Sequence, residues 1–155
     1  MTTFEKITQY LSEKSISFRA VHHAATLTSE ASAKARGEDL SVGGKAIVIK
    51  VDTEFKLFVL SAALKIDSQK IRDHFNAKKT RFASAEELHQ LTGLAPGSIP
   101  PFGKPILNLD LFVDASIVRN EVIAFNAGSL TDSIIMSAKD YLKITQPVIL
   151  EFSQT

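Results

Sequence analysis

The sequence predicts a single α/β domain with a mixed β-sheet, and three observations support that expectation. A chain of 155 residues suits one domain with a sizeable buried core. Residues 45–51 form an almost unbroken run of β-branched side chains, which is the composition of a strand buried on both faces. Around this run, short strand-like and helix-like segments alternate without the regular long spacing of a doubly wound sheet.

Apolar periodicity and capping residues mark the expected helices. In residues 3–14, Phe4, Ile7 and Leu11 share one helical face. The next helical segment, 29–36, is rich in small residues that can pack closely against a sheet. The remaining signals are Thr28, Asp67 and a Ser84–Glu87 capping box at helix starts, Gly37 and Gly93 at helix ends, and a last short helix over residues 138–144.

β-branched and aromatic runs between turn residues mark the expected strands. Residues 45–51 and 56–60 flank a polar turn and are predicted to form a hairpin. The other expected strands are 18–21, 80–83, 106–113, 122–125, 134–136 and 148–152. We expect the whole chain, residues 1–155, to form one domain with a Phe-, Leu- and Ile-packed interior.

The composition excludes several classes of protein and site. The formal net charge of +1 argues against a general polyanion binder, although it allows a small basic patch. Because there is no cysteine, disulfides, thiolate zinc sites and a cysteine nucleophile are excluded. No apolar run approaches the roughly 20 residues that cross a membrane, and the chain opens without a signal-peptide pattern. We therefore expect a cytoplasmic protein.

Neither a metal site nor a serine hydrolase site is expected. His22 and His23 are adjacent, so on a strand they would point to opposite faces and could not easily bind one metal. His74 and His89 fall on separate predicted helices. Ser129 lacks the strand-to-helix elbow of a serine nucleophile. An enzyme with this sequence would therefore work without a cofactor and without a protein nucleophile.

Lys45 follows the pair Gly43–Gly44 at the start of the 45–51 strand. The pair does not form a phosphate-binding P-loop, because alanine follows the lysine and a strand rather than a helix comes next. Two interpretations remain open at this point. Lys45 is either a surface lysine at a strand start or a cation that meets a negative group of a substrate.

The stretch from Gly93 to Gly103 contains three glycines and three prolines in eleven residues. Such a rigid path can hold backbone N–H groups close to a carbonyl or a developing oxyanion. Residues 125–129 form a second turn of polar and small residues. Together with Lys45, these two segments could form three walls of one pocket.

The order of these segments resembles the YbaK/prolyl-tRNA-synthetase-associated domains, which hydrolyse mischarged aminoacyl-tRNA, and most of all their YeaK-like branch. The resemblance covers nearly the whole chain. It rests on His23 and the helix to Gly37, Lys45 at a hydrophobic strand, Leu91–Gly93, the Gly-x-x-x-Pro loop from Gly97 to Pro101 with Phe102–Gly103 after it, Phe125–Gly128, and Asp140-Tyr141-Leu142 with Ile144 and Gln146-Pro147.

The resemblance implies a mixed, barrel-like sheet flanked by helices and a trans-editing aminoacyl-tRNA deacylase acting on a small or hydroxylated amino acid such as Ser, Thr or Ala. Lys45 would position the ester or the terminal adenosine, and Gly97 would hold the substrate carbonyl. The implied substrate-binding residues are His23, Ala46, Ser98, Ile99, Pro101, Asn126, Gly128 and Ser133. No metal and no cofactor are implied.

Two positions depart from the family pattern. Many relatives carry Thr or Asn where this chain has Ala46, and the cysteine-editing branch carries an aspartate where it has Ser133. The alternative is therefore a non-catalytic module of the same fold that binds tRNA or an aminoacyl-adenosine. The implied partners are the aminoacylated 3′ end of tRNA and, further, an aminoacyl-tRNA synthetase. The protein would be a monomer or a homodimer, and no membrane association is expected. Lys78, Lys79 and Arg81 form a local basic excess that either meets the acceptor stem or is an ordinary solvated surface.

Overall fold

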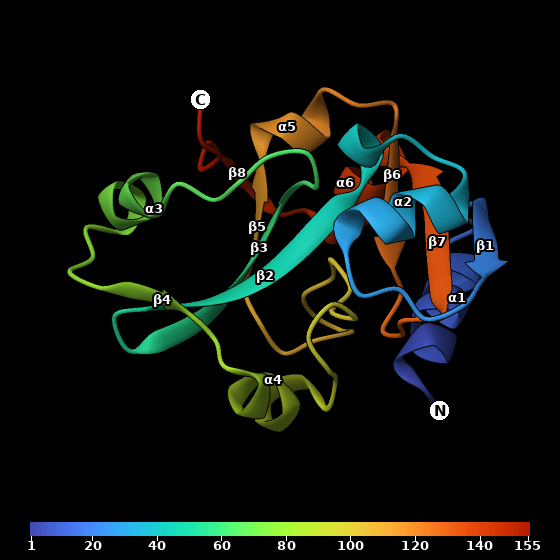
Figure 1. The fold of residues 1–155 in the computed structure, drawn as a ribbon, viewed down its shortest axis with the longest axis horizontal. Helices are drawn as coiled ribbons and strands as arrows, with labels where there is room; N and C mark the ends of the chain where they lie inside the picture. The colour runs from blue at the N-terminus through green and yellow to red at the C-terminus, as the bar shows by residue number, and fades with distance from the viewer.

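Eight strands form two β-sheets, with helices around them, in the computed structural model, which describes residues 1–155 (Figure 1). The strands are β1 (Phe18–His22), β2 (Gly44–Val51), β3 (Glu54–Ser61), β4 (Thr80–Phe82), β5 (Leu111–Asp114), β6 (Val122–Asn126), β7 (Asp132–Ser137) and β8 (Val148–Leu150). The larger sheet has the order β4–β2–β3–β5–β8 and mixes antiparallel and parallel neighbours. The smaller sheet, β1–β7–β6, is antiparallel.

The two sheets meet where the glycine pair leads into β2. A parallel bridge joins Gly43 to Ala124 of β6. A Cβ at Gly43 would lie 2.9 Å from the Cβ of Ala62, and a Cβ at Gly44 would lie 2.6 Å from the Cδ1 of Ile123. Both glycines are therefore required by the close approach of the sheets. The predicted mixed sheet is confirmed, whereas the strands form two open sheets joined at this bridge and no closed barrel is found.

Five of the six α-helices begin at or next to the residues that the sequence marks, whereas the short helix over Ala115–Val118 is not among the predicted elements. The six helices are α1 (Thr3–Glu13), α2 (Ser29–Arg36), α3 (Ser68–Phe75), α4 (Ala85–Thr92), α5 (Ala115–Val118) and α6 (Ala138–Thr145), with a 3₁₀ turn η1 over Leu40–Val42. Ser84 and Glu87 form the predicted capping box of α4. Thr28 caps α2 through its side chain, and Gly37 ends that helix in the left-handed conformation.

The prediction of a strand over residues 106–113 is wrong in its first half. The N–H groups of Ile106 and Leu107 both donate to the carbonyl of Gly103, so this segment turns, and β5 begins only at Leu111. The apolar side chains of Leu107 and Leu109 are nevertheless buried in a cluster with β2 and β3. A short apolar run that is buried from a turn has the same composition as a buried strand, so the pattern could not separate the two.

The core is packed chiefly by Phe, Leu and Ile, as the sequence predicts. Phe58 of β3 and Phe112 of β5 are neighbours in the larger sheet and stack with ring centroids 5.4 Å apart, and Phe152 packs against Phe58 in the same cluster. Ile7 and Leu11 of α1 pack into a second cluster with the smaller sheet. The longest helix, α1, has 11 residues, and none in the structure has the length and hydropathy of a membrane-spanning helix.

Candidate active site

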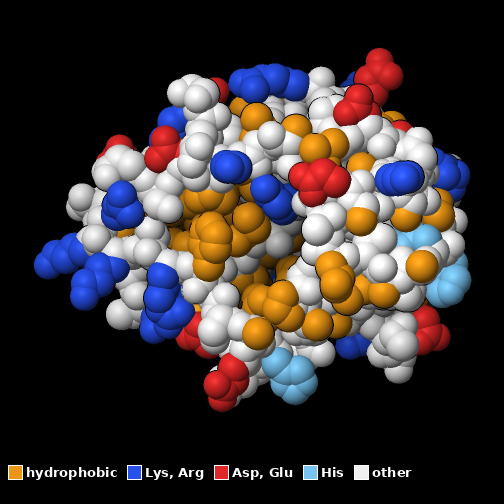
Figure 2. All heavy atoms as spheres, in the orientation of Figure 1, with side chains coloured by type: hydrophobic (Ala, Val, Ile, Leu, Met, Phe, Trp, Pro, Cys, Tyr) orange, Lys and Arg blue, Asp and Glu red, His pale blue; other side chains and the backbone are white.

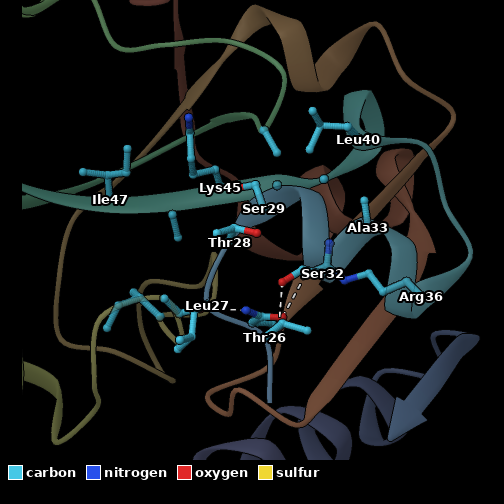
Figure 3. A pocket seen from close by; sticks show the side chains of 17 residues that line it. Thr26, Leu27, Thr28, Ser29, Ser32, Ala33, Arg36, Leu40, Lys45 and Ile47 are labelled. Atoms are coloured by element: carbon cyan, nitrogen blue, oxygen red, sulfur yellow. Dashed lines mark hydrogen bonds between the residues drawn. The ribbon is translucent and has the colours of Figure 1, made fainter. Parts of the chain in front are cut away.

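A cavity of about 230 Å³ lies where the start of β2 passes the helix α2 and the Gly97 loop (Figure 3). Figure 2 shows this face of the molecule hollowed near its centre, with hydrophobic side chains along the hollow. Seventeen residues line the cavity: Thr26, Leu27, Thr28, Ser29, Ser32, Ala33, Arg36, Leu40, Gly43, Gly44, Lys45, Ala46, Ile47, Ala62, Gly97, Ile99 and Asn126. The three walls expected from the sequence are thus brought together.

Lys45 is a half-buried cation at this cavity and not a freely solvated lysine. Its Nζ donates a hydrogen bond of 2.7 Å to the carbonyl of Leu64, which leaves two N–H donors for another partner. Burial lowers the pKa of Lys45; the nearby carboxylate of Glu30 raises it and Lys65 lowers it further, so the net direction is downward. The structure therefore favours the interpretation in which Lys45 faces a ligand site.

Gly97 lies at the tip of a tight turn that faces the cavity. The turn is closed by the N–H of Ser98, which donates to the carbonyl of Ala95 at 3.2 Å, with Pro96 and Gly97 as the central residues. Gly97 has φ of +87°, the value that a type II turn requires at its third position and that glycine adopts most easily. Neither the N–H of Gly97 nor that of Ile99 donates a hydrogen bond within the protein, so both are available to a ligand.

Arg36 is a buried cation at the cavity, and the sequence analysis did not single it out. Only 8% of the residue is exposed. Its Nε donates to the Oγ of Ser133 and its Nη2 to the Oδ1 of Asn126, each at 2.9 Å. Asn126 in turn donates from Nδ2 to the carbonyl of Gly97 at 2.7 Å. The Gly97 turn is therefore fixed through Asn126 to a guanidinium under the cavity.

His23 and Ser133 do not line the cavity but form a hydrogen-bonded cluster with the Arg36 side chain. His23 Nδ1 lies 2.9 Å from the carbonyl of Ala24, and its Nε2 lies 2.9 Å from the Oγ of Ser133. A neutral His23 must therefore carry its proton on Nδ1 and accept the Ser133 hydroxyl at Nε2. Ser133 Oγ also accepts from Arg36 Nε, and Asn126 Oδ1, 3.2 Å away, is a second possible acceptor for the single Ser133 proton.

The cavity is electropositive. Two of the lining residues, Lys45 and Arg36, are cations, and no lining residue is an aspartate or a glutamate. Arg36 makes no ion pair, and burial lowers its pKa to about 10, which still leaves the guanidinium charged at neutral pH. A buried charge usually has a charged partner, and the Arg36 guanidinium has none in the protein. The cavity is therefore suited to a ligand that brings oxygen acceptors.

The structure places the predicted site residues in two groups. Lys45, Ala46, Gly97, Ile99 and Asn126 line the cavity, whereas His23, Ser98, Pro101, Gly128 and Ser133 do not.

The predicted site residues that lie outside the cavity make other contacts. Ser98 turns its hydroxyl to the carbonyl of Ala95, and the carbonyl of Pro101 accepts from the buried Tyr141 hydroxyl. Gly128 contacts Thr3 of α1 so closely that a Cβ would lie 2.6 Å from its Cβ. No group of three or more His, Asp or Glu side chains is arranged to hold a metal ion.

Lys45 and a fixed glycine turn with free backbone donors line one cavity that contains no nucleophile–base pair, an arrangement that can bind and polarise a carbonyl group. Such a site belongs to proteins that act on activated esters by positioning. The chain belongs to the aminoacyl-tRNA editing domain family, whose model matches residues 23–144.

Two kinds of relative have similar sequences. The multifunctional Ser/Thr-tRNA deacylase ProXp-y of Escherichia coli K12 is 36% identical over 159 aligned residues, which cover 99% of this chain and 94% of that protein. The proline–tRNA ligase of Shouchella clausii is 34% identical over 109 residues, which cover 70% of this chain but only 19% of the ligase.

Solved structures share the fold at lower identity. A protein described as a candidate trans-editing enzyme for prolyl tRNA synthetase superposes with a TM-score of 0.85 at 21% identity, covering 100% of this chain and 99% of that one. The hypothetical protein APE2540 gives a TM-score of 0.86 at 19% identity, covering 96% and 99%. These likenesses establish the overall α/β arrangement.

Proposed function

We propose that this chain is a trans-editing deacylase that hydrolyses the ester of a mischarged aminoacyl-tRNA. The observation that carries the proposal is the cavity in which Lys45 and the free N–H of Gly97 lie together, in a chain of the editing family. The name of the E. coli relative supports Ser and Thr as the amino acids removed. A cavity of about 230 Å³ also suits a small amino acid.

The reaction needs positioning more than a strong protein nucleophile. An aminoacyl ester is already activated, so water, or a ribose hydroxyl of the substrate acting with it, can attack the carbonyl carbon. As the ester C–O bond breaks, the terminal ribose leaves as an alcohol and takes one proton, and the free amino acid is released. The carbonyl oxygen carries the developing negative charge, which N–H donors stabilise.

In this proposal the Gly97 turn holds that oxygen. The N–H groups of Gly97 and Ile99 have no partner in the protein, and the hydrogen bond from Asn126 to the Gly97 carbonyl keeps the turn in place. Donors that are fixed before the substrate arrives do not have to reorganise as charge develops. Lys45, with two N–H donors left, binds a phosphate or hydroxyl oxygen of the terminal adenosine or the ester itself.

The partner is then the aminoacylated 3′ end of a tRNA, in the cytoplasm. Lys78 and Lys79 are exposed beside β4 and can approach a phosphate backbone, whereas Arg81 is already paired with Glu87 at 2.7 Å. Likeness to part of a proline–tRNA ligase favours an aminoacyl-tRNA synthetase as a further partner. We expect a monomer or a homodimer.

A panel of mischarged tRNAs tests the proposal. One tRNA charged in turn with Ser, Thr, Ala and Pro is incubated with the protein, and release of the amino acid is followed against buffer. We expect Ser and Thr to be released fastest. If no ester is hydrolysed faster than in buffer while an uncleavable aminoacyl-adenosine analogue still binds, the chain is the non-catalytic module that Ala46 and Ser133 raise as an alternative.

A further inference from the structure

Arg36 presents an unused donor to the cavity. Its Nε and Nη2 are bonded to Ser133 and Asn126, but its Nη1 makes no hydrogen bond within the protein. Nη1 lies on the cavity side, since a Cβ built on Gly43, a lining residue, would be 3.7 Å from it. Figure 3 shows the Arg36 side chain directed inward from α2 toward Ser32.

The surroundings of this nitrogen form a polar end of the cavity. Ser32 and Thr26 are almost completely buried, and their hydroxyl oxygens lie 2.8 Å apart (Figure 3). One of these two hydroxyls donates to the other, which leaves the second with a proton to offer. The rest of the lining mixes apolar side chains, among them Leu27, Ala46 and Ile99, with polar ones such as Thr28 and Ser29. A ligand that reaches this end of the cavity therefore meets the free Nη1 of Arg36 and one free hydroxyl proton, both of which can donate to an oxygen atom.

The charge of Arg36 has no counterpart in the protein. No Asp or Glu lines the cavity, and only neutral oxygens accept from the guanidinium. Burying an unpaired cation is costly, and a leucine or methionine would fill the same space at lower cost. Its presence is explained if the free donor is needed by the substrate.

We propose that Arg36 is a specificity-determining residue whose Nη1 donates to the side-chain hydroxyl of a Ser or Thr ester bound in the cavity. This inference rests on the proposed deacylase function. A buried donor left unpaired is penalised far more than a missing methylene, so such a site discriminates strongly against an amino acid without the hydroxyl. The guanidinium also repels a cationic side chain, so Lys and Arg esters should react more slowly.

The test compares esters that differ only in the hydroxyl. The kcat/KM for deacylation of one tRNA charged with Ser and with Ala is measured for the wild type and for Arg36→Met, and the isosteric pair Thr and Val is measured in the same way. We expect the Ser/Ala and Thr/Val ratios to fall by about 10- to 150-fold in the variant, the range for one hydrogen bond to a charged donor. Lys34→Met removes an exposed charge from the same helix and should leave both ratios unchanged.

A purely structural role for Arg36 predicts a different pattern. If Arg36→Met slows all four esters equally, the residue supports the Gly97 turn but does not recognise the hydroxyl, and the inference is wrong. If the wild type hydrolyses none of them, the proposed function fails instead. The inference is then decided by the affinities of uncleavable seryl- and alanyl-adenosine amides, and equal affinities of the wild type for the two would overturn it.

A variant that keeps the positive charge separates a loss of recognition from a loss of folding. Arg36→Lys retains a cation that can bond to Ser133 and Asn126, but its single nitrogen is then held at those two acceptors and cannot also occupy the position of Nη1. We expect this variant to melt near the wild-type temperature and to lose most of the Ser/Ala preference. A wild-type preference in a folded Arg36→Lys protein would contradict the assigned donor.

Discussion

Replacing Lys45 by Met tests the cation at the cavity with little change in packing. Methionine preserves most of the apolar stem but removes the ammonium and its 2.7 Å hydrogen bond to the carbonyl of Leu64. Losing this hydrogen bond destabilises the folded state, whereas removing the half-buried charge stabilises it because the desolvation penalty disappears. We therefore expect the free energy of unfolding to change by no more than about 1 kcal/mol, which is about 2–4 °C in Tm for a chain of this size.

Activity should respond much more than stability. A hydrogen bond between a charged donor and a substrate oxygen contributes about 1.5–3 kcal/mol, so kcat/KM for seryl-tRNA should fall about 10- to 150-fold. The assay is single-turnover release of labelled serine, with melting followed by circular dichroism. The matched control is Lys65→Met, which removes an exposed charge near Lys45. Equal rates for the two variants and the wild type would refute the role given to Lys45.

Three further predictions follow from other parts of the structure. Gly97→Ala forces a side chain into φ of +87°, so we expect a loss of about 1–2 kcal/mol in stability by denaturant unfolding and slower deacylation, because the turn must change. Asp114→Ala should cost about 2–4 kcal/mol, since the carboxylate accepts from the N–H groups of Ser116, Phe152 and Ser153. Burial alone would raise the pKa of Asp114, but these hydrogen bonds outweigh it and lower the pKa. The stabilisation is therefore complete above the unfolded pKa of about 3.9 and is lost as the pH falls through the lower folded pKa, so the Tm difference between wild type and variant should shrink in acid. Finally, lysyl- and arginyl-tRNA should be released at least about 10-fold more slowly than seryl-tRNA, because the cavity holds two cations and no acid; comparable rates would contradict the electrostatic argument.

Local signals in the sequence were sufficient for most of the elements. Each of the caps at Thr28, Asp67 and Ser84 is made by a side chain that bonds to the backbone of its own helix, so the information lies within a few residues. The β2–β3 hairpin likewise follows from a local turn between two apolar runs. The turn over 104–110 could not be predicted because its leucines are buried by contacts with strands that are distant in the sequence. No local pattern of residues marks that burial.

The candidate site was predicted only in part, for a similar reason. Lys45, Gly97 and Asn126 stand out because each interrupts or ends an apolar or rigid segment, and all three line the cavity. Arg36 looks like an ordinary last-turn cation of a helix, where charged residues are usually exposed. The small residues of α2 were the available clue, since they let the helix approach the sheet and bury whatever side chain faces it.

The arrangement of the two sheets also explains why distant segments share one cavity. The bridge between Gly43 and Ala124 holds the start of β2 beside β6, which carries Asn126 at its end. Asn126 then reaches across to the carbonyl of Gly97. No spacing in the sequence encodes that contact, because 29 residues separate the two positions and the bridge depends on glycines whose role is visible only in three dimensions.

The central claim is that the cavity between Lys45 and the Gly97 turn holds the aminoacyl ester. A crystal structure with an uncleavable seryl-adenosine amide tests it most directly. We expect the amide carbonyl oxygen within hydrogen-bond distance of the Gly97 N–H, with Lys45 Nζ on an oxygen of the analogue and the serine hydroxyl toward Arg36. An analogue bound elsewhere, for example in the shallow groove beside Lys70 and His74, would contradict the account.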